Sequence, residues 1–275
     1  MKKILDSIKN QGFCEYTFVP DRSFINFAHY ICNISLSDEV LKNESKGYSN
    51  ELLNVIDEDK RSYLERFGKN FFLNHKWWLK KLLISPRLLS IDVYRTEYDD
   101  QAANNPTHAM LWHRDLDDQF PHVKVFFPLN KINLNNGAFC YAEKQICKLN
   151  EKLVDINLIK KLKNINDPYI AKDSIRVTNE TFLKYFEKKV KIFEGDVGSA
   201  LFIDTNNCYH RGGQILKKNL ERNMMVLNFG GITHKFNDFS NYSNFDKFKV
   251  YVYNKLKRIQ FRITGEIHSK KIFLS

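Results

Sequence analysis

The chain has few of the residues and segments that mark secreted or membrane-spanning proteins. Its 275 residues include five cysteines, six prolines and eleven glycines, and no two cysteines form a CxxC pair. An odd number of cysteines without a secretory signal fits reduced thiols. We therefore expect a cytoplasmic protein.

Long apolar runs are also missing. No stretch reaches the roughly 18 apolar residues that suggest a transmembrane helix. The N-terminal residues Met1–Asp6 resemble the charged start of a signal peptide, but polar residues follow where an apolar segment is needed. The sequence predicts no transmembrane segment, and it contains no internal repeat, low-complexity linker or specific nucleic-acid-binding motif.

Aromatic residues and lysines are plentiful. Aromatics make up 14% and apolar residues 43% of the chain, which is enough for a substantial core, and the length of 275 residues predicts one large domain over residues 1–275, or at most two. The formal charge of +11 suggests acidic partners or a lysine-rich composition. We favour composition because the lysines are scattered, although the charge mildly favours an anionic small substrate.

Residues 1–87 are predicted to be mostly helical. Asp21 is a candidate N-cap for an amphipathic helix, and Ser49 precedes a second apolar pattern of helical spacing. A longer helix is expected over Asp59–Ile84, with Gly68 as a candidate break.

Residues 88–232 show the alternation of β-strands. The expected strands cover residues 89–93, 109–115, 122–129, 139–142, 190–192, 200–204 and 222–230. Asn135-Asn136-Gly137 is a hairpin turn signal. Many short strands joined by glycine-containing turns predict a sandwich or barrel.

Three segments lie outside this pattern. The polar stretch 97–107 is a candidate lid. Residues 144–188 are predicted to be a helical insertion, with one helix around Leu149–Ile156 and another around Phe182–Phe186. The C-terminal extension 233–275 is basic and aromatic, and its pattern favours neither helix nor strand.

His113 and Asp115 are the first candidate metal ligands. Two residues apart on a strand, they point to the same face and can bind one ion, such as iron, zinc or manganese. His210, near the end of a later strand, is the natural third ligand. Two histidines and one carboxylate on one face of a metal are the signature of non-haem Fe(II) oxygenases. The alternatives are a surface hydrogen-bonded pair for the first two and a core histidine for the third.

The order of motifs resembles the phytanoyl-CoA dioxygenase (PhyH-like) family of Fe(II)- and 2-oxoglutarate-dependent oxygenases. The resemblance covers roughly residues 88–232. It rests on His113-x-Asp115, Lys124-Val125-Phe126-Phe127-Pro128-Leu129, Asn136-Gly137-Ala138-Phe139, Gly195-Asp196, His210-Arg211-Gly212-Gly213 and Arg222. It implies a mainly β fold, a double-stranded β-helix (jelly roll, cupin-like barrel), with an N-terminal helical region and a helical insertion.

The same resemblance implies the roles of four residues. His113, Asp115 and His210 would bind Fe(II), 2-oxoglutarate and O2 would be the co-substrates, and Arg222 would hold the distal carboxylate of 2-oxoglutarate. A guanidinium suits that task because it matches a carboxylate bidentately and stays charged. The alternative for Arg222 is a salt bridge on a strand. An aspartate at position 115 disfavours halogenation, since family-like halogenases have a small residue there.

One position departs from the family pattern. The type enzyme of the family has a serine two residues after the distal histidine, where this chain has Gly212. The resemblance therefore implies neither further 2-oxoglutarate contacts nor a CoA-ester substrate.

Residues beside the motifs are weaker candidates. Arg114 and Arg211 are expected to face away from the neighbouring histidines, and Lys124 is a candidate contact for an anionic group. Trp112 and Cys208 are expected to be packing residues.

The leading hypothesis is an Fe(II)- and 2-oxoglutarate-dependent dioxygenase that hydroxylates an unactivated C–H bond of a small or lipid-like substrate. One alternative is a non-catalytic cupin-like metal-binding or scaffold protein. Another is a basic protein that binds surfaces through its C-terminal segment.

Overall fold

The computed structural model describes residues 2–35, 50–53, 55–82, 87–100, 108–115, 122–144, 178–230, 248 and 252. The helices are α1 (Lys2–Gln11), α2 (Arg22–Asn33), α4 (Glu58–Leu82), α8 (Asn179–Phe186) and the short 3-10 helices η1 (His108–Met110) and η2 (Glu187–Lys189). The strands are β1 (Phe13–Thr17), β2 (Asn50–Glu51), β3 (Arg87–Glu97), β4 (His122–Pro128), β5 (Phe139–Ala142), β6 (Val190–Phe193), β7 (Ser199–Asp204), β8 (His210–Arg211) and β9 (Glu221–Gly230). No described helix is long and apolar enough to cross a membrane.

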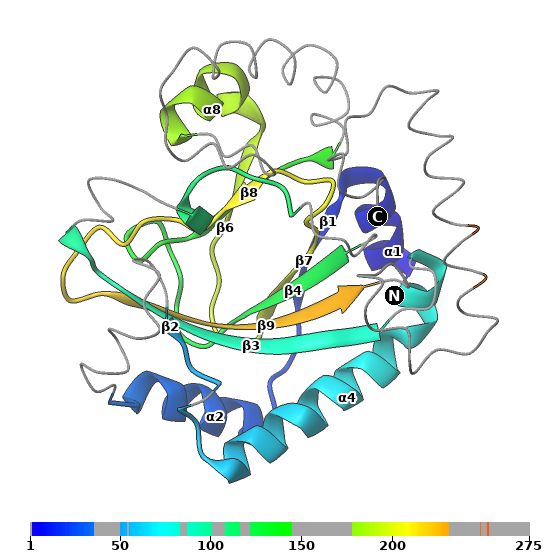
Figure 1. The fold of residues 1–275 in the computed structure, drawn as a ribbon, viewed down its shortest axis with the longest axis vertical. Helices are drawn as coiled ribbons and strands as arrows, with labels where there is room; N and C mark the ends of the chain where they lie inside the picture. The colour runs from blue at the N-terminus through cyan, green and yellow to red at the C-terminus, as the bar shows by residue number, and fades with distance from the viewer. Residues whose placement is uncertain are drawn as a thin grey trace.

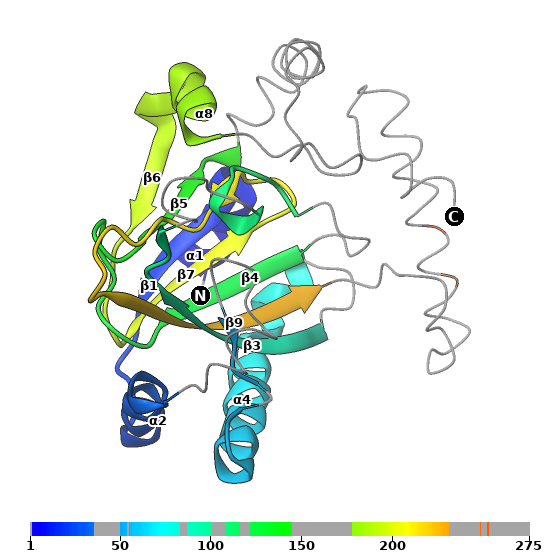
Figure 2. The same cartoon turned by 60° about the vertical axis from the view of Figure 1, so that its left-hand side comes forward.

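Two antiparallel sheets form the centre of the fold. The larger has the strand order β1-β7-β4-β9-β3-β2, and the smaller has the order β6-β5-β8. Figure 1 shows α2 and α4 on one side of the larger sheet, the smaller sheet on its other side, and α8 beyond the smaller sheet. The turned view in Figure 2 shows the same layers. This is the mainly β architecture with flanking helices that the sequence predicts.

The two faces of the larger sheet differ in chemistry. On β4 and β9, Val125 and Leu227 pack into the main core with α1, α2 and α4. Successive side chains on a strand point to opposite faces, so Lys124 and Asn228 face the smaller sheet. The register pairs Lys124 with Asn228 across the two strands. The face that packs on the helices is apolar, and the face inside the barrel carries polar groups.

Each of the two long helices, α2 and α4, is preceded by an aspartate that accepts a hydrogen bond from the first turn. Asp21 accepts a hydrogen bond from the backbone N–H of Phe24 at 2.7 Å, which confirms it as the N-cap of α2. Asp57 accepts one from the N–H of Lys60 at 2.8 Å at the start of α4.

α4 continues past Gly68, so the predicted break is wrong. A Cβ at this glycine would lie 2.5 Å from Cδ1 of Ile91, so the glycine lets the helix approach β3 closely.

The helix expected after Ser49 is also wrong, although Ser49 itself lies outside the described residues. Asn50–Glu51 form β2 at the edge of the larger sheet, opposite Tyr94 and Arg95 of β3. The N–H of Leu52 bonds the carbonyl of Val93 at 2.8 Å. Pairing with β3 satisfies the backbone hydrogen bonds of this segment, and it overrides the helical spacing of the apolar residues.

Residues 109–115 do not form the continuous strand predicted. The segment begins as η1 and then makes one isolated antiparallel bridge between His113 and His210. The next backbone bond comes from the N–H of Asp115 to the carbonyl of Thr205. Thr205 belongs to the turn between β7 and β8. The segment therefore pairs with β8 only at His113 and then pairs with this turn at Asp115.

The turn at Asn135-Asn136-Gly137 exists, but it does not join a hairpin. Gly137 has a positive φ of 84°, a conformation that favours glycine. The strands on either side pair with different partners: β4 with β7 and β9, and β5 with β6 and β8. The turn therefore carries the chain from one sheet to the other.

The remaining predicted segments are described in part. α8 confirms the second helix predicted in the 144–188 insertion, while the helix around Leu149–Ile156 lies outside the described residues. Of the candidate lid, residues 97–100 are described. Of the C-terminal extension, residues 248 and 252 are described.

Candidate metal centre

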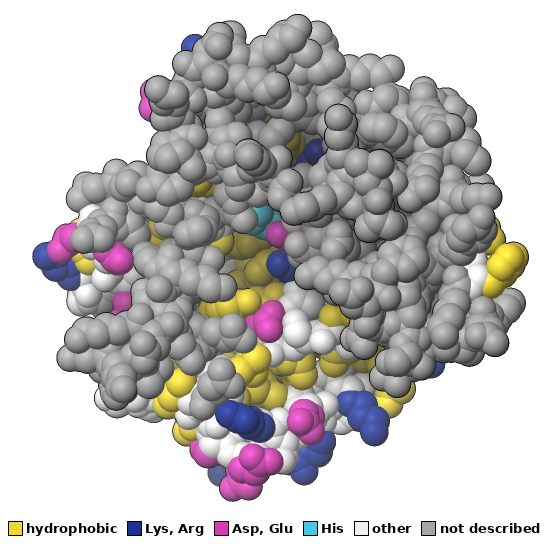
Figure 3. Space-filling model, in the orientation of Figure 1, with side chains coloured by type: hydrophobic (Ala, Val, Ile, Leu, Met, Phe, Trp, Pro, Cys, Tyr) yellow, Lys and Arg dark blue, Asp and Glu magenta, His cyan; other side chains and the backbone are white. Residues whose placement is uncertain are grey.

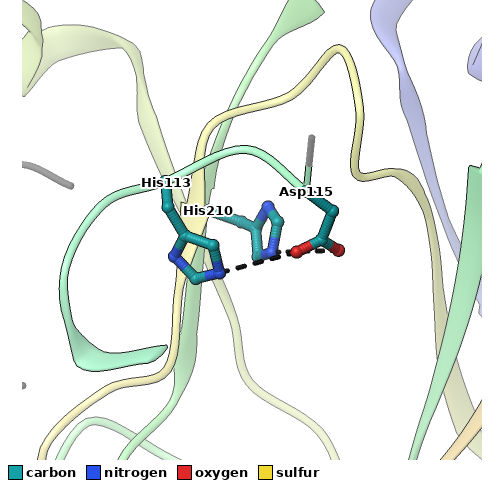
Figure 4. Close-up of side chains that lie close together, drawn as sticks. All are labelled: His113, Asp115 and His210. Atoms are coloured by element: carbon teal, nitrogen blue, oxygen red, sulfur yellow. Dashed lines mark ion pairs between the residues drawn. The ribbon is translucent and has the colours of Figure 1, made fainter. Parts of the chain in front are cut away.

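His113, Asp115 and His210 converge inside the barrel. Their candidate ligand atoms all lie within 4.8 Å of one another. Nε2 of His113 is 3.7 Å from Oδ1 of Asp115, and Nε2 of His210 is 3.7 Å from Oδ2. Figure 4 shows the three side chains pointing toward one another. The structure thus brings together the three residues that the sequence nominates.

The two histidines face each other because their backbones are paired. The N–H of His113 bonds the carbonyl of His210 at 3.0 Å, and the reverse bond is 2.9 Å. Directly opposite residues of an antiparallel pair project to the same face. The ring centroids are accordingly 4.4 Å apart, at an interplanar angle of 50°.

Asp115 is positioned by the turn that follows β7. Its N–H bonds the carbonyl of Thr205 at 3.0 Å, and its own carbonyl accepts a bond from Nδ2 of Asn206 at 2.5 Å. The turn is fixed by Asp204, whose carboxylate accepts from Nδ2 of Asn207 at 2.8 Å. Sequence reasoning missed these residues. The polar run 204–207 after an apolar strand was the available signal.

Backbone carbonyls set the tautomer of both imidazoles. Nδ1 of His113 lies 2.7 Å from the carbonyl of Leu111, and Nδ1 of His210 lies 3.1 Å from that of Cys208. A carbonyl accepts but cannot donate, so each Nδ1 carries the proton and each Nε2 presents a lone pair. Two lone pairs and a carboxylate at these distances repel one another unless a cation lies between them. This donor set fits a divalent metal of the first transition row.

Lys124 keeps the carboxylate of Asp115 ionised. Burial alone would raise the pKa of Asp115, but the ammonium of Lys124 holds that pKa well below its usual range. Nζ of Lys124 is 2.8 Å from Oδ2 of Asp115. The anionic group that Lys124 contacts in this structure is therefore a member of the triad.

Arg222 lies on the inner face of β9 and is 9% exposed. Its guanidinium donates to the carbonyls of Gly137 and Gly213 and lies 3.3 Å from Oγ1 of Thr96. Burial lowers the pKa of Arg222 to about 10, so the group stays charged at neutral pH. Within the described ranges it forms no ion pair with a carboxylate.

A buried cation without a counter-ion is costly, and Arg222 therefore suits an anionic ligand. Glycines make the space around it. A Cβ at Gly212 would lie 3.2 Å from one terminal nitrogen of the guanidinium, and a Cβ at Gly137 would lie 3.1 Å from the other. The glycine that departs from the family pattern is therefore adjacent to Arg222.

The other nominated residues lie outside the triad. The guanidinium of Arg114 stacks over the ring of Tyr209 at 5.2 Å, and that of Arg211 over Trp112 at 5.7 Å. Trp112 is fully buried and stacks on Phe182 of α8 at 4.0 Å, as expected for a packing residue. Cys208 is buried and is not one of the three converging groups.

A hollow leads to the triad. In the space-filling view of Figure 3, a histidine, an acidic and a basic side chain lie in a depression bordered by hydrophobic side chains. The ring of Phe139 stacks beside His210 at 5.6 Å, and Phe126 packs on Phe139 at 4.4 Å. The depression therefore combines a polar centre with apolar walls.

The fold matches three solved structures, of which HygX was solved with 2-oxoglutarate bound and SnoK is described as α-ketoglutarate dependent. AviO1 from Streptomyces viridochromogenes Tue57 aligns with a TM-score of 0.54 and 12% identity, over 85% of this chain and 96% of its own. HygX from Streptomyces hygroscopicus, solved with nickel and 2-oxoglutarate bound, aligns with a TM-score of 0.52 and 11% identity, over 84% and 87%. SnoK, a non-heme α-ketoglutarate-dependent carbocyclase from nogalamycin biosynthesis, aligns with a TM-score of 0.50 and 12% identity, over 84% of each chain.

At these identities the likeness concerns the fold, and it confirms the predicted jelly roll. A scan against protein-family models found no match, and a search of curated proteins found no significant match.

Proposed function

We propose that this chain is an Fe(II)- and 2-oxoglutarate-dependent dioxygenase of the PhyH-like type that hydroxylates an unactivated C–H bond of a small molecule. The observation that carries the proposal is the pairing of two sites in one barrel. One is the buried triad of His113, Asp115 and His210, and the other is Arg222, which lacks a carboxylate partner among the described residues.

In this proposal the two imidazole Nε2 atoms and the Asp115 carboxylate hold the metal on one face. The carbonyls of Leu111 and Cys208 fix the Nδ1–H tautomer and the orientation of the imidazoles, and Lys124 keeps Asp115 charged. Arg222 takes the distal carboxylate of 2-oxoglutarate through charge-assisted hydrogen bonds. The bound iron supplies the oxidative chemistry in which 2-oxoglutarate and O2 give succinate, CO2 and one oxygen atom for the substrate.

Support for the co-substrate comes from HygX, which shares the fold and was solved with 2-oxoglutarate bound. That the reaction is a hydroxylation is a more specific proposal than the use of iron and 2-oxoglutarate. SnoK shares the fold and is described as a carbocyclase, so the fold alone does not select the outcome at the substrate carbon. Apolar walls beside the triad suit a substrate that presents a C–H bond there.

The test is anaerobic addition of Fe(II) and 2-oxoglutarate to the full chain. We expect a weak metal-to-ligand charge-transfer band in the visible, and slow succinate formation when O2 is admitted. Asp115→Ala should abolish the band, because the metal loses its protein carboxylate. Asp6→Ala, which removes an exposed carboxylate from α1, should leave it unchanged.

Two outcomes would contradict the proposal. A wild-type chain with neither the band nor succinate would rule out the enzyme. Metal binding without any 2-oxoglutarate binding would instead favour a cupin-like metal-binding protein.

A further inference from the structure

A second polar group lies on the inner wall of the barrel, on β3 and β9. Nδ2 of Asn228 donates to Oδ2 of Asp92 at 2.5 Å and to Oγ of Ser90 at 2.8 Å. Ser90 also donates to the same carboxylate oxygen at 3.3 Å. These contacts use one oxygen of Asp92 and the amide nitrogen of Asn228.

Two acceptor atoms of this group remain without partners in the described part of the chain. Asn228 is 6% exposed, yet its Oδ1 is buried and accepts no hydrogen bond. Its orientation is fixed, because a carboxylate can only accept and so must face the NH2 end of the amide. Asp92, which is half-buried, forms no ion pair with a described residue. A buried acceptor without a hydrogen bond costs free energy, so Oδ1 of Asn228 suits a ligand that donates, and the half-buried carboxylate of Asp92 beside it can accept from the same ligand.

The group lies on the wall formed by the larger sheet, from which Lys124 of β4 reaches the triad. Asn228 is directly opposite Lys124 in the register of β9 and β4, and Lys124 contacts Asp115 at 2.8 Å. Arg222 lies six residues along the same strand, which is roughly 20 Å at the rise of an extended chain. Asn228 therefore lies level with Lys124 on this wall, and Arg222 lies farther along β9 from both.

We propose that Ser90, Asp92 and Asn228 form the recognition site for a hydrogen-bond donor of the prime substrate, either a hydroxyl or an ammonium group. The inference rests on the proposed function, and it gives that function a substrate class. The donor binds Asp92 and Oδ1 of Asn228, while the C–H bond to be oxidised faces the triad. The charge of these three residues is that of the Asp92 carboxylate, although Lys124 lies opposite Asn228 and the whole chain carries +11.

Matched probes test the site without requiring turnover. Cyclohexylamine, cyclohexanol and cyclohexanecarboxylate share a ring and differ in the polar group. Each is titrated into the full chain without added metal and followed by ligand-observed NMR. We expect the amine or the alcohol to bind at least about tenfold more tightly than the carboxylate. Preference for the amine assigns an ammonium group, and preference for the alcohol assigns a hydroxyl group.

Two variants locate the binding. Asp92→Asn keeps the shape of the side chain and should weaken amine binding by about ten- to a hundredfold, because a charge-assisted bond is lost. Glu65→Gln removes one charge from the exposed side of α4, across the larger sheet, and should change nothing. Asn228→Leu should weaken alcohol binding, with folding checked by circular dichroism.

Because Arg222 can itself bind a carboxylate, the comparison is repeated in Arg222→Met. Equal or tighter binding of the carboxylate that persists in Arg222→Met, no binding of any probe, or equal responses of Asp92→Asn and Glu65→Gln would overturn the site. The anaerobic charge-transfer band is recorded on the same wild-type sample. Its absence would overturn the proposed function, whereas its presence without donor-selective binding would overturn this inference alone.

Discussion

The two faces of the larger sheet use the same strands for different purposes. On β4, the outward Phe127 is fully buried and touches rings from α2 and α4, while its neighbour Phe126 faces the barrel and is half-buried. On β9, Leu227 faces the helices and Asn228 faces the barrel. A shift of one residue would exchange the two sets. Alternate residues of each strand thus serve stability on one face and chemistry on the other. Two neighbouring residues can therefore be used to test the two roles separately.

The largest effect is expected from the outward face. Phe127→Ala should lower the free energy of unfolding by about 3–5 kcal/mol, because it opens a cavity in the main core. Urea denaturation of the metal-free chain measures this. Phe126→Ala is the matched control, and its loss should be clearly smaller because that ring is half-buried. Equal losses would mean that the two faces do not differ in the way described.

The next effect concerns the barrel face at Arg222. At 2-oxoglutarate near one hundred times its dissociation constant, with Mn(II) present, the wild-type chain should gain about 2.7 kcal/mol of stability. Arg222→Met should reduce 2-oxoglutarate affinity by about one to two decades and lose about half of that gain or more. Arg66→Met on the exposed side of α4 is the control. A full gain in Arg222→Met would show that the guanidinium has a structural role.

A smaller effect is expected at the turn that holds Asp115. Asn206→Ala removes the bond to the Asp115 carbonyl, and loss of such an outer contact typically weakens metal affinity by about ten- to a hundredfold. Competition with a coloured chelator measures it. Thr205→Ala is the control, because the Thr205 hydroxyl has no hydrogen-bond partner among the described residues and the residue acts through its carbonyl. Equal metal affinities in the two variants would show that Asn206 does not position Asp115 for metal binding.

The smallest effect belongs to the outer layer. Asp21→Ala removes the N-cap of α2 and should cost about 1 kcal/mol of unfolding free energy. Metal and 2-oxoglutarate affinities should stay at wild-type values. A change in either affinity would mean that the helical layer and the barrel are coupled.

The parts of this molecule that sequence predicted depend on local chemistry. The apolar alternation of β4, β7 and β9 and the cap at Asp21 require no knowledge of distant partners. His113 and His210 were paired through residue type and a family resemblance, and the structure places their backbones in one bridge.

The parts that sequence missed depend on contacts between distant segments. The position of Asp115 depends on the turn around Asn206, and Gly68 matters because β3 lies against α4. The helix expected after Ser49 was wrong because β3 offers a free edge to Asn50–Glu51. No local pattern contains these partners.

The most direct test is a crystal structure of the full chain grown with Mn(II) and 2-oxoglutarate without O2. We expect one anomalous peak bound by Nε2 of His113, a carboxylate oxygen of Asp115 and Nε2 of His210, with the distal carboxylate of 2-oxoglutarate on Arg222. A chain with no peak among these three residues, or with 2-oxoglutarate held away from Arg222, would contradict it.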